Sequence, residues 1–285
     1  MTLARSIAAL AANERLNYVA TNWLPRRTLT RAMGRFSKIE HPWVARASIA
    51  VWKTFSAVDL SDARDGAWRS MHACFIRQLT PGARTFVANR DQLASPSDGI
   101  VVASGAIAGD SIVQAKGRRY SIAELTGGEG DAYIGGSFVT LRLTAGMYHR
   151  FHAPQDGTVD RVRYFPGDCF NVNPPALKRV DRLYCRNERA TVRLRLNDGT
   201  PVLLVPVAAI LVAAIRLTFL DTVALLRDRA EPVADCDAAL AQGDEMGWFE
   251  QGSTIVMLAP APFRLADKLT TGDMVRAGNV LFDRG

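Results

Sequence analysis

The spacing of apolar residues changes once along the chain and divides it into two regions. Five apolar residues near helical spacing precede Pro25, which ends or bends that run: Leu3, Ile7, Leu10, Leu16 and Val19. A second stretch, from residue 26 on, carries basic residues beside Trp43 and Trp52. This pattern predicts a helical region over residues 1–65.

From about residue 85 the chain consists of short β-type runs separated by Gly, Pro and Asp. The runs are GIVVASGAI, SFVTLRL, GTVDRVRYF, ATVRLRL, PVLLVPV and STIVML. Runs of this length and composition are typical of half-buried and fully buried strands. The sequence therefore predicts an α+β fold with a mainly β core, in which a β-rich domain over residues 66–285 follows the helical region.

A continuous apolar run, PVLLVPVAAILVAAI at residues 201–215, suggests a membrane span at first sight. It is shorter than the ~20 residues that a helical span needs. Pro206 interrupts the run, and Arg216 and Asp221 follow it closely. A buried strand that leads into a second element explains the segment better.

The net charge of +7 is concentrated near the N-terminus. Residues 1–60 hold nine Lys/Arg and three Asp/Glu, which leaves +6 in that segment. Each basic residue close to an anionic membrane surface contributes roughly 1 kcal/mol to binding. A basic amphipathic region with Trp43 and Trp52 therefore predicts docking on such a surface. The alternative is an ordinary solvated helical face packed on the domain.

The cysteine pattern argues against a disulfide framework. The four cysteines form no CxxC pair and no secretory signal precedes them, so we expect reduced thiols in a protein that faces the cytosol. With 285 residues, of which 48% are hydrophobic, the chain can bury a full core.

Candidate chemistry lies in three short segments. GMYHRFHAP places His149 and His152 three residues apart, SPSDG places Asp98 in a turn before a strand, and GST places Ser253 at the start of an apolar run. Taken singly, each has an ordinary explanation, as loop histidines, turn chemistry or a strand residue. Together they offer an orienting carboxylate, a general base and a hydroxyl nucleophile.

A zinc hydrolase is the alternative enzyme. His149, His152 and Asp98 would bind the metal and activate water. This alternative leaves the Gly-Ser-Thr segment unexplained.

Several blocks, in order and spacing, resemble those of one family from about residue 15 to the end. They are SMHACFIRQLTPGAR, SPSDG, QAKGRRYSIAELTG, GGSFVTLRLTAGMYHRFHAP, NER and GDEMGWFEQGSTIVML. The chain resembles the phosphatidylserine decarboxylase proenzymes of the bacterial, membrane-associated, pyruvoyl-dependent type. Each block alone is modest support, whereas the whole set in order is highly specific.

The resemblance implies that the precursor cuts itself between Gly252 and Ser253. The products would be a long chain, 1–252, and a short chain, 253–285. Asp98 would orient His152, which takes the proton of the Ser253 hydroxyl as its oxygen attacks the Gly252 carbonyl. Elimination from the resulting ester and loss of ammonia would leave a covalent pyruvoyl group at position 253, with Thr254 hydrogen bonding near the cut.

The pyruvoyl group would then form a Schiff base with phosphatidylserine and accept the electrons released as CO2 leaves, giving phosphatidylethanolamine. His149 is the candidate for the acid that protonates the carbanion, or for positioning the headgroup. No external cofactor and no metal are expected.

The resemblance also implies a location and partners. We expect a peripheral protein on the cytoplasmic face of the cell membrane, an anionic membrane surface as partner, a homodimer, and no nucleic acid. TTGDMVRAGNVLFDRG resembles the closing hairpin of lipoyl and biotin carrier domains, which suggests a β core of the barrel-sandwich hybrid type. A carrier role is poorly supported, because Lys268 precedes that hairpin. A membrane-binding remnant that never cleaves itself is the remaining non-enzymatic alternative.

Three positions depart from the family pattern. Met147 stands where the family often has Asp, and Ala208 and Ala213 stand where it has glycines. Because glycine lets backbones approach closely, these alanines are expected to reshape the pocket and to affect headgroup preference.

Overall fold

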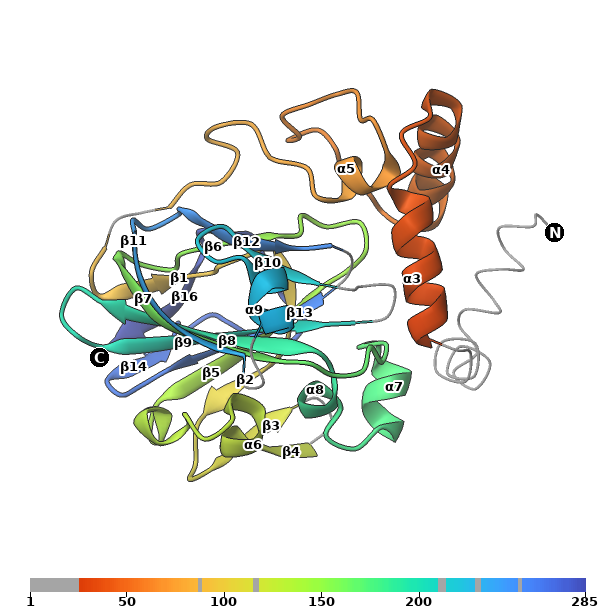
Figure 1. The fold of residues 1–285 in the computed structure, drawn as a ribbon. Helices are drawn as coiled ribbons and strands as arrows, with labels where there is room; N and C mark the ends of the chain where they lie inside the picture. Colours follow the sequence, from red (N-terminus) through yellow and green to blue (C-terminus); the bar gives the residue numbers. More distant parts are fainter. Residues whose placement is uncertain (1–25, 87–88, 115–117, 210–213, 229–231, 251–252) are drawn as a thin grey trace.

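The structure is a computed structural model that describes residues 26–86, 89–114, 118–209, 214–228, 232–250 and 253–285. Strands predominate and helices are few within these residues, which confirms the prediction of an α+β fold with a mainly β core (Figure 1). The finer prediction, a barrel-sandwich hybrid, stays a prediction. The predicted amphipathic run before Pro25 lies outside the described residues.

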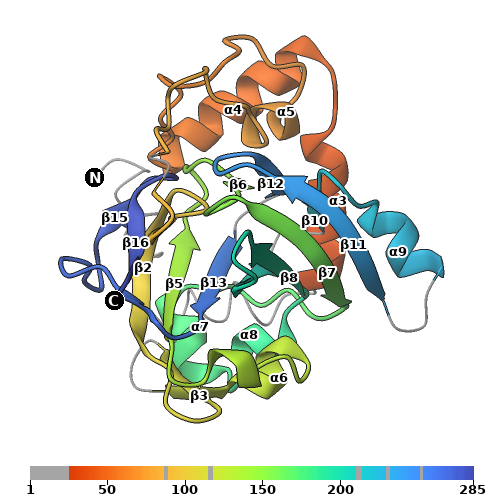
Figure 2. The same cartoon turned by 90° about the vertical axis from the view of Figure 1, so that its left-hand side faces the viewer.

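The central element is an antiparallel eight-stranded sheet in the order β11-β7-β8-β9-β13-β5-β2-β15. Its strands, in chain order, are β2 (Gly99–Ala106), β5 (Ser137–Leu143), β7 (Gly157–Phe165), β8 (Arg189–Leu196), β9 (Pro201–Ala208), β11 (Val233–Leu240), β13 (Ser253–Ala259) and β15 (Met274–Val275). The late strand β13 lies between β5 and β9, in the interior of this sheet (Figure 2). The fold of the body is therefore incomplete without the C-terminal segment.

Three small sheets flank the central one. One contains β1 (Gln92–Ala94), β16 (Val280–Arg284) and β14 (Phe263–Leu265). Another contains β10 (Ile215–Leu217), β12 (Glu245–Phe249) and β6 (Arg150–His152), and the third pairs β3 (Ser111–Gln114) with β4 (Arg118–Ser121). The sheet with β6 is the one that carries the predicted general base.

Both faces of β13 are buried, which explains why its sequence is continuously apolar rather than alternating. Ile255 and Met257 pack in the larger hydrophobic core on one face. Val256 and Leu258 pack in a second core on the other face.

The helices are short and most of them lie at the rim of the β body. They are α3 (Arg26–Ser37), α4 (Pro42–Phe55), α5 (Met71–Phe75), α6 (Ile122–Thr126), α7 (Pro174–Arg179), α8 (Leu183–Arg186), α9 (Thr222–Asp228) and the 3-10 turn η2 (Asp131–Tyr133). Pro42 lies at the first position of α4, where the missing N–H costs nothing. None of the helices within the described residues is long and apolar enough to cross a membrane.

The prediction of a buried strand at the start of the 201–215 run is confirmed, because β9 covers residues 201–208 and is almost entirely buried. Residues 210–213 of that run lie outside the described residues, and the strand β10 follows. The run therefore supplies strands to two different sheets.

A small apolar cluster joins the helical region to the β body. Trp52 of α4 packs on Phe75 of α5 with ring centroids 5.7 Å apart, and Cys74 completes the buried centre. Trp68 and Leu60 pack around it. Because this cluster crosses the predicted boundary near residue 65, the helices and the β body share packing there. The boundary itself stays a prediction.

Candidate active site

Ser253 is the first residue of β13 and is fully buried. It lies opposite Leu143 of β5 and Ala208 of β9. Its hydroxyl oxygen has no hydrogen-bond partner among the described residues. A buried hydroxyl without a partner costs about 1–3 kcal/mol, so its position favours a chemical role over a structural one.

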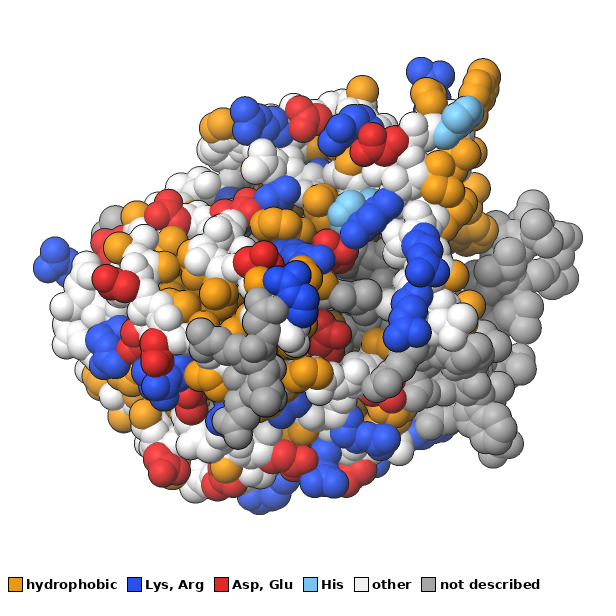
Figure 3. Space-filling view, viewed as in Figure 1, with side chains coloured by type: hydrophobic (Ala, Val, Ile, Leu, Met, Phe, Trp, Pro, Cys, Tyr) orange, Lys and Arg blue, Asp and Glu red, His pale blue; other side chains and the backbone are white. Residues whose placement is uncertain are grey.

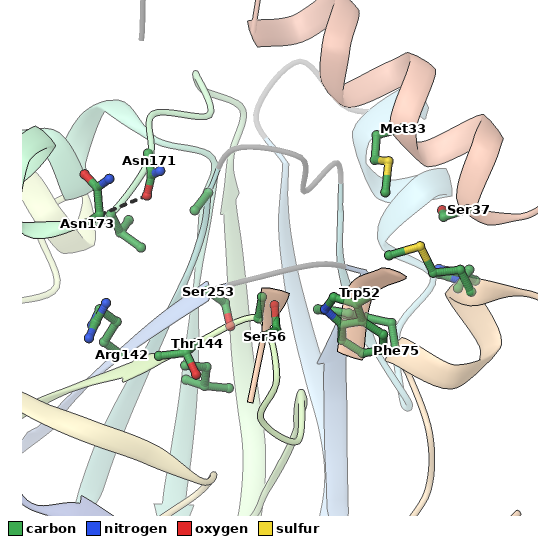
Figure 4. A pocket seen from close by; sticks show the side chains of 16 residues that line it. Met33, Ser37, Trp52, Ser56, Phe75, Arg142, Thr144, Asn171, Asn173 and Ser253 are labelled. Atoms are coloured by element: carbon green, nitrogen blue, oxygen red, sulfur yellow. Dashed lines mark hydrogen bonds between the residues drawn. The ribbon is translucent and has the colours of Figure 1, made fainter. Parts of the chain in front are cut away.

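Ser253 lines a cavity of about 440 Å³ at the place where β5 and β9 end and β13 begins. The cavity has two unlike walls, and Figure 4 shows the serine between them. On one side lie polar residues of β5 and of the loop before α7: Arg142, Thr144, Asn171 and Asn173. On the other side lie apolar residues of the helical region: Met33, Trp52, Met71 and Phe75.

His152, on β6, has both ring nitrogens occupied. Nδ1 lies 2.8 Å from the Gly243 carbonyl oxygen, and Nε2 lies 3.0 Å from the Tyr148 hydroxyl. Because a carbonyl only accepts, Nδ1 carries the proton, so in the neutral ring Nε2 accepts from Tyr148. Burial lowers the pKa of His152, which keeps the ring neutral and basic near neutral pH.

Gly243, whose carbonyl accepts from His152, adopts a backbone conformation that favours glycine. Its φ is +87°, and a Cβ there would lie 2.9 Å from the Phe86 ring. A side chain at this position would therefore displace either the carbonyl that fixes the His152 tautomer or Phe86, whose ring packs 5.7 Å from that of His152.

Asp98 binds a cation rather than a histidine. Its two oxygens accept from Nε and Nη2 of Arg84 at 2.8 and 2.6 Å, and Oδ1 also accepts from the Ala277 N–H at 3.0 Å. Arg84 also donates to Asp62 at 2.9 Å. Within the described part of the chain, no direct hydrogen bond joins Asp98 to His152. Burial has the larger effect on the pKa of His152 and lowers it, whereas the charge of Asp98 raises it.

His149 is fully buried, and neither of its ring nitrogens has a hydrogen-bond partner among the described residues. Its ring packs on Phe75 with centroids 4.0 Å apart. Burial and the nearby Arg77 guanidinium lower the pKa of His149 to about 3. The ring is therefore neutral, and it reaches the Ser253 cavity only through its contact with Phe75.

Two arginines fix the segment that carries both histidines. Arg77 is buried and donates to the Gly146 carbonyl at 3.1 Å. Arg150 donates from Nη2 to the Ile76 carbonyl at 2.7 Å and from Nη1 to Glu245 at 2.6 Å. These contacts tie α5 and the residues after it to the histidine segment and to β12.

The predicted residues border three adjoining hollows. Ser253 and Thr144 line the first, Thr144, Asp98 and Tyr148 line the second, and Tyr148 and His152 line the third. Thr144 lines both the first and the second hollow, and Tyr148 lines both the second and the third. None of the hydrogen bonds between described residues joins the Ser253 hydroxyl to Asp98, His149 or His152.

The segment before the predicted cut is held from two sides at Glu250. Glu250 accepts from Lys38, which follows α3, at 2.9 Å and from Arg216 of β10 at 3.2 Å. Gly252 lies outside the described residues. The helical region thus makes direct ionic contact with the segment that leads to the predicted cut.

The NER segment has a structural role. Asn187 donates to the Ala208 carbonyl at 2.8 Å and so anchors the end of β9 opposite Ser253. Glu188 accepts from the buried Tyr164 hydroxyl, and burial raises the pKa of that carboxyl group. Arg189 donates to three backbone carbonyls around α6 and α8: those of Leu125, Glu124 and Cys185.

The departures from the family pattern lie close to the serine. The Met147 N–H donates to the Thr144 carbonyl at 3.0 Å, and the Met147 sulfur lies 3.4 Å from the Thr144 N–H, where a carboxylate would be a stronger acceptor. Ala208 is fully buried directly opposite Ser253. Ala213 lies outside the described residues.

The zinc hydrolase is not favoured. The part of the chain that the structure describes holds no group of three His, Cys, Asp or Glu side chains arranged for a metal ion. Asp98 is committed to Arg84, and both nitrogens of His152 are engaged. The four cysteines are free thiols, as the sequence predicts.

Sequence reasoning missed Tyr148, Arg84 and Arg142. Tyr148 stands in the same GMYHRFHAP segment as the histidines, so its place in the block was the available signal. Arg84 ends the SMHACFIRQLTPGAR block and Arg142 lies in GGSFVTLRLTAGMYHRFHAP, so their blocks were a signal too, but only the fold brings them to Asp98 and to the cavity.

A buried nucleophile-type hydroxyl at the first residue of a central strand, beside a cavity, indicates an enzyme whose candidate active site lies in the core of its sheet. Comparison with known proteins also indicates an enzyme. The family model described as phosphatidylserine decarboxylase matches residues 71–283. The phosphatidylserine decarboxylase proenzymes of Yersinia pestis (strain Pestoides F) and Yersinia pseudotuberculosis (serotype O:1b, strain IP 31758) are each 34% identical over 272 residues, which cover 90% of this chain and 92% of each relative. The chain belongs to the phosphatidylserine decarboxylase family.

The buried His149 predicts how stability changes with pH. The unfolded ring takes up a proton near its ordinary pKa of 6.5, whereas the folded ring does so only near 3. Between these values the unfolded state binds more protons, so folding stability falls as the pH falls. We expect His149→Phe to make the loss of stability from pH 6.5 to 4.5 shallower, by up to about 1.4 kcal/mol per pH unit.

Urea unfolding at several pH values measures this slope, and the exposed His41→Phe is the matched control. A slope equal to that of the parent would contradict a neutral, buried His149.

Proposed function

We propose that this chain is a phosphatidylserine decarboxylase precursor that makes its own pyruvoyl group from Ser253 and converts phosphatidylserine to phosphatidylethanolamine with release of CO2. The observation that carries the proposal is the buried, unpartnered Ser253 hydroxyl beside the two-walled cavity. Family membership gives the substrate and the carboxy-lyase reaction.

Self-cleavage begins at Ser253. Its hydroxyl oxygen attacks the Gly252 carbonyl, and the peptide nitrogen leaves as an amine, so that an ester replaces the amide. Loss of the Cα proton and of the ester oxygen then releases the carboxylate of the long chain 1–252. Tautomerisation and hydrolysis of the remaining enamine give ammonia and the pyruvoyl ketone at the start of the short chain.

His152 is the proposed base for the first step, and burial, by lowering its pKa, keeps the ring in the neutral form that can accept a proton. To act on Ser253, Nε2 exchanges the Tyr148 hydroxyl for the serine. Asp98 supports the ring through its charge and holds Arg84 near Tyr148, whose ring lies 6.0 Å from the guanidinium carbon. Thr254 is fully buried beside the cut with its hydroxyl unpartnered among the described residues, which fits the proposed hydrogen bond near the cleaved bond.

The surroundings of Ser253 fit a pyruvoyl group. After cleavage β13 keeps its pairing with both β5 and β9, which holds the new N-terminus of the short chain beside the cavity. When present, the pyruvoyl carbonyl supplies an electron sink for decarboxylation. The apolar wall excludes water from that position.

His149 is the proposed proton donor after CO2 leaves. Burial and the Arg77 charge keep its ring neutral, so the ring would act as a relay, taking up a proton at one nitrogen as the other nitrogen gives its proton to the carbanion. The side chain contacts Phe75, which lines the cavity, so the role requires Phe75 to move aside. Positioning of the headgroup is the other role that this contact allows.

Docking of the helical region on an anionic membrane surface belongs to the same proposal. Trp43, Val51 and Phe55 lie four or eight residues apart on α4 and are 74%, 57% and 58% exposed. Figure 3 shows orange side chains along the outer edge of α4 and blue side chains over the neighbouring α3. An exposed apolar stripe beside basic residues is typical of a helix that lies in the membrane interface. A peripheral position on the cytoplasmic face of the cell membrane and a homodimer remain predictions.

Intact-mass measurement on the denatured protein tests self-cleavage. We expect two chains divided after Gly252, the short one lighter by the ammonia lost and blocked to N-terminal sequencing. Ser253→Ala removes the nucleophile and gives one full-length chain. Ser56→Ala removes another hydroxyl that lines the same cavity and gives the two chains of the parent. A full-length parent chain would sink the proposal.

Lys38→Ala tests whether the Lys38–Glu250 ion pair supports self-cleavage. Losing this partly exposed ion pair with Glu250 should slow cleavage roughly two- to five-fold, as expected for a contact of about 0.5–1 kcal/mol, while the mature enzyme keeps its kcat. Lys53→Ala removes the same charge from an exposed position on α4 and is the control. A time course of precursor disappearance measures the rate, and equal half-times for both variants would contradict the coupling.

Trp43→Ser tests membrane docking. Loss of this exposed aromatic side chain should lower the partition coefficient onto vesicles rich in anionic lipid by roughly ten-fold or more. Met274→Ser removes a side chain that is 71% exposed on β15 and should leave partitioning unchanged. Co-sedimentation with vesicles gives both values, and equal losses for the two variants would argue against a docking face on α4.

A further inference from the structure

We propose that Arg142 and Asn171 form a subsite for the phosphodiester of the lipid headgroup and so contribute to substrate binding. The inference rests on the proposed function and adds residues to which the family resemblance assigns no role. Figure 4 shows Arg142 and Asn171 on the same side of the cavity, with Ser253 nearer its centre.

The strand register places Arg142 next to the reacting residue. Arg142 lies opposite Thr254, the neighbour of Ser253, while Leu143 lies opposite Ser253 itself. Successive residues of a strand point to opposite faces. Arg142 and Ser253 nevertheless border one cavity, because it lies over the place where β5 ends and β13 begins.

Arg142 lacks the anion that comparable arginines have. Its Nε is buried without a hydrogen-bond partner, and none of the ion pairs between described residues includes it. By contrast, Arg84 and Arg150 each bind a carboxylate. A partly buried guanidinium without a counter-charge is unfavourable, and a bound phosphodiester would remove that penalty.

Asn171 supplies a neutral donor on the same side of the cavity as this cation. Its Oδ1 accepts from the Asn173 N–H at 3.0 Å, which leaves the amide NH2 group as the donor available to a ligand. A guanidinium and an amide together match an acceptor with several oxygens.

The two walls of the cavity match the two ends of a phospholipid headgroup. The apolar wall, which includes Met33, Trp52 and Phe75, suits the glycerol and acyl side. The polar wall suits the phosphodiester. In the lipid the amine lies beyond the phosphodiester from the glycerol, a short link from the phosphorus, so the headgroup would turn within the cavity to bring its amine to Ser253.

The reaction itself favours the phosphodiester over the carboxylate as the partner of Arg142. The carboxylate loses its charge as CO2 leaves, so a guanidinium bound to it would stabilise the ground state more than the transition state and slow the reaction. The phosphodiester keeps its charge throughout. A contact to it is equally strong in both states, which raises affinity without changing kcat.

Steady-state decarboxylation of phosphatidylserine in mixed micelles tests the subsite. We expect Arg142→Gln to raise KM roughly 10- to 100-fold, the range for a lost charge-assisted contact, with kcat within a few-fold of the parent. Mass spectrometry should show normal cleavage after Gly252. Arg264→Gln removes the same charge from an exposed position on β14 and should leave KM unchanged.

Inhibition by glycerophosphoethanolamine identifies the group that Arg142 binds, because this compound has the phosphodiester and the amine without the carboxylate. We expect its inhibition constant to rise in Arg142→Gln by the same factor as KM. A raised KM with an unchanged inhibition constant would assign Arg142 to the carboxylate and overturn the proposal. An unchanged KM would overturn it as well.

Two further measurements keep the outcome decisive. If Arg142→Gln does not fold, Arg142→Lys keeps the charge without the flat, two-pronged donor, and both constants should rise together by a smaller factor. A parent that releases no CO2 from phosphatidylserine contradicts the proposed function, whereas an active parent with unaltered Arg142 variants contradicts only the subsite.

Discussion

The pairing of β13 with two neighbours at once is the constraint on which the site depends. Ser253 is fixed between Leu143 and Ala208 by antiparallel ladders on both sides, and Asn187 anchors the Ala208 carbonyl from the end of the sheet. A nucleophile at the first residue of an interior strand can be positioned only after the strands on both sides have assembled. The proposed self-cleavage would therefore be coupled to folding, and the complete burial of the strand would keep it in the sheet after the cut.

Buried arginines supply the second level of organisation. Arg77, Arg84 and Arg150 connect the segment after the docking helices to the histidine segment, to Asp98 and to β12. Each satisfies its charge with backbone carbonyls or carboxylates, which repays the cost of removing it from water. These contacts are directional, so they connect the segment after α4 to the histidine segment, while Lys38 connects the end of α3 to Glu250. Under the proposed function they would connect membrane docking to the geometry of the cut.

The sequence predicts the elements of this fold better than it predicts their contacts. The apolar run after Ser253 indicates a strand that is buried on both faces, because no alternation is present, and β13 has that property. Its neighbours β5 and β9 could not be predicted, since strand partners are chosen by packing between distant segments. In the same way Asp98 was expected beside His152, whereas its carboxylate meets Arg84 across a loop. The local sequence pattern does not indicate which basic side chain a folded loop places against a carboxylate.

The hydrogen bond between Tyr148 and His152 gives the unreacted chain a defined resting state. With Nδ1 held by Gly243 and Nε2 occupied by Tyr148, the ring is neutral, correctly protonated for a base and not in contact with the serine. In the proposed mechanism Nε2 would exchange Tyr148 for Ser253, and Thr144 and Tyr148 each line two of the hollows that border these groups. A base that must first exchange Tyr148 for Ser253 would leave the precursor uncleaved until the residues around it are in place. The ion pair from Lys38 to Glu250 extends the same dependence to the docking helices, so completion of the site follows assembly of the whole molecule.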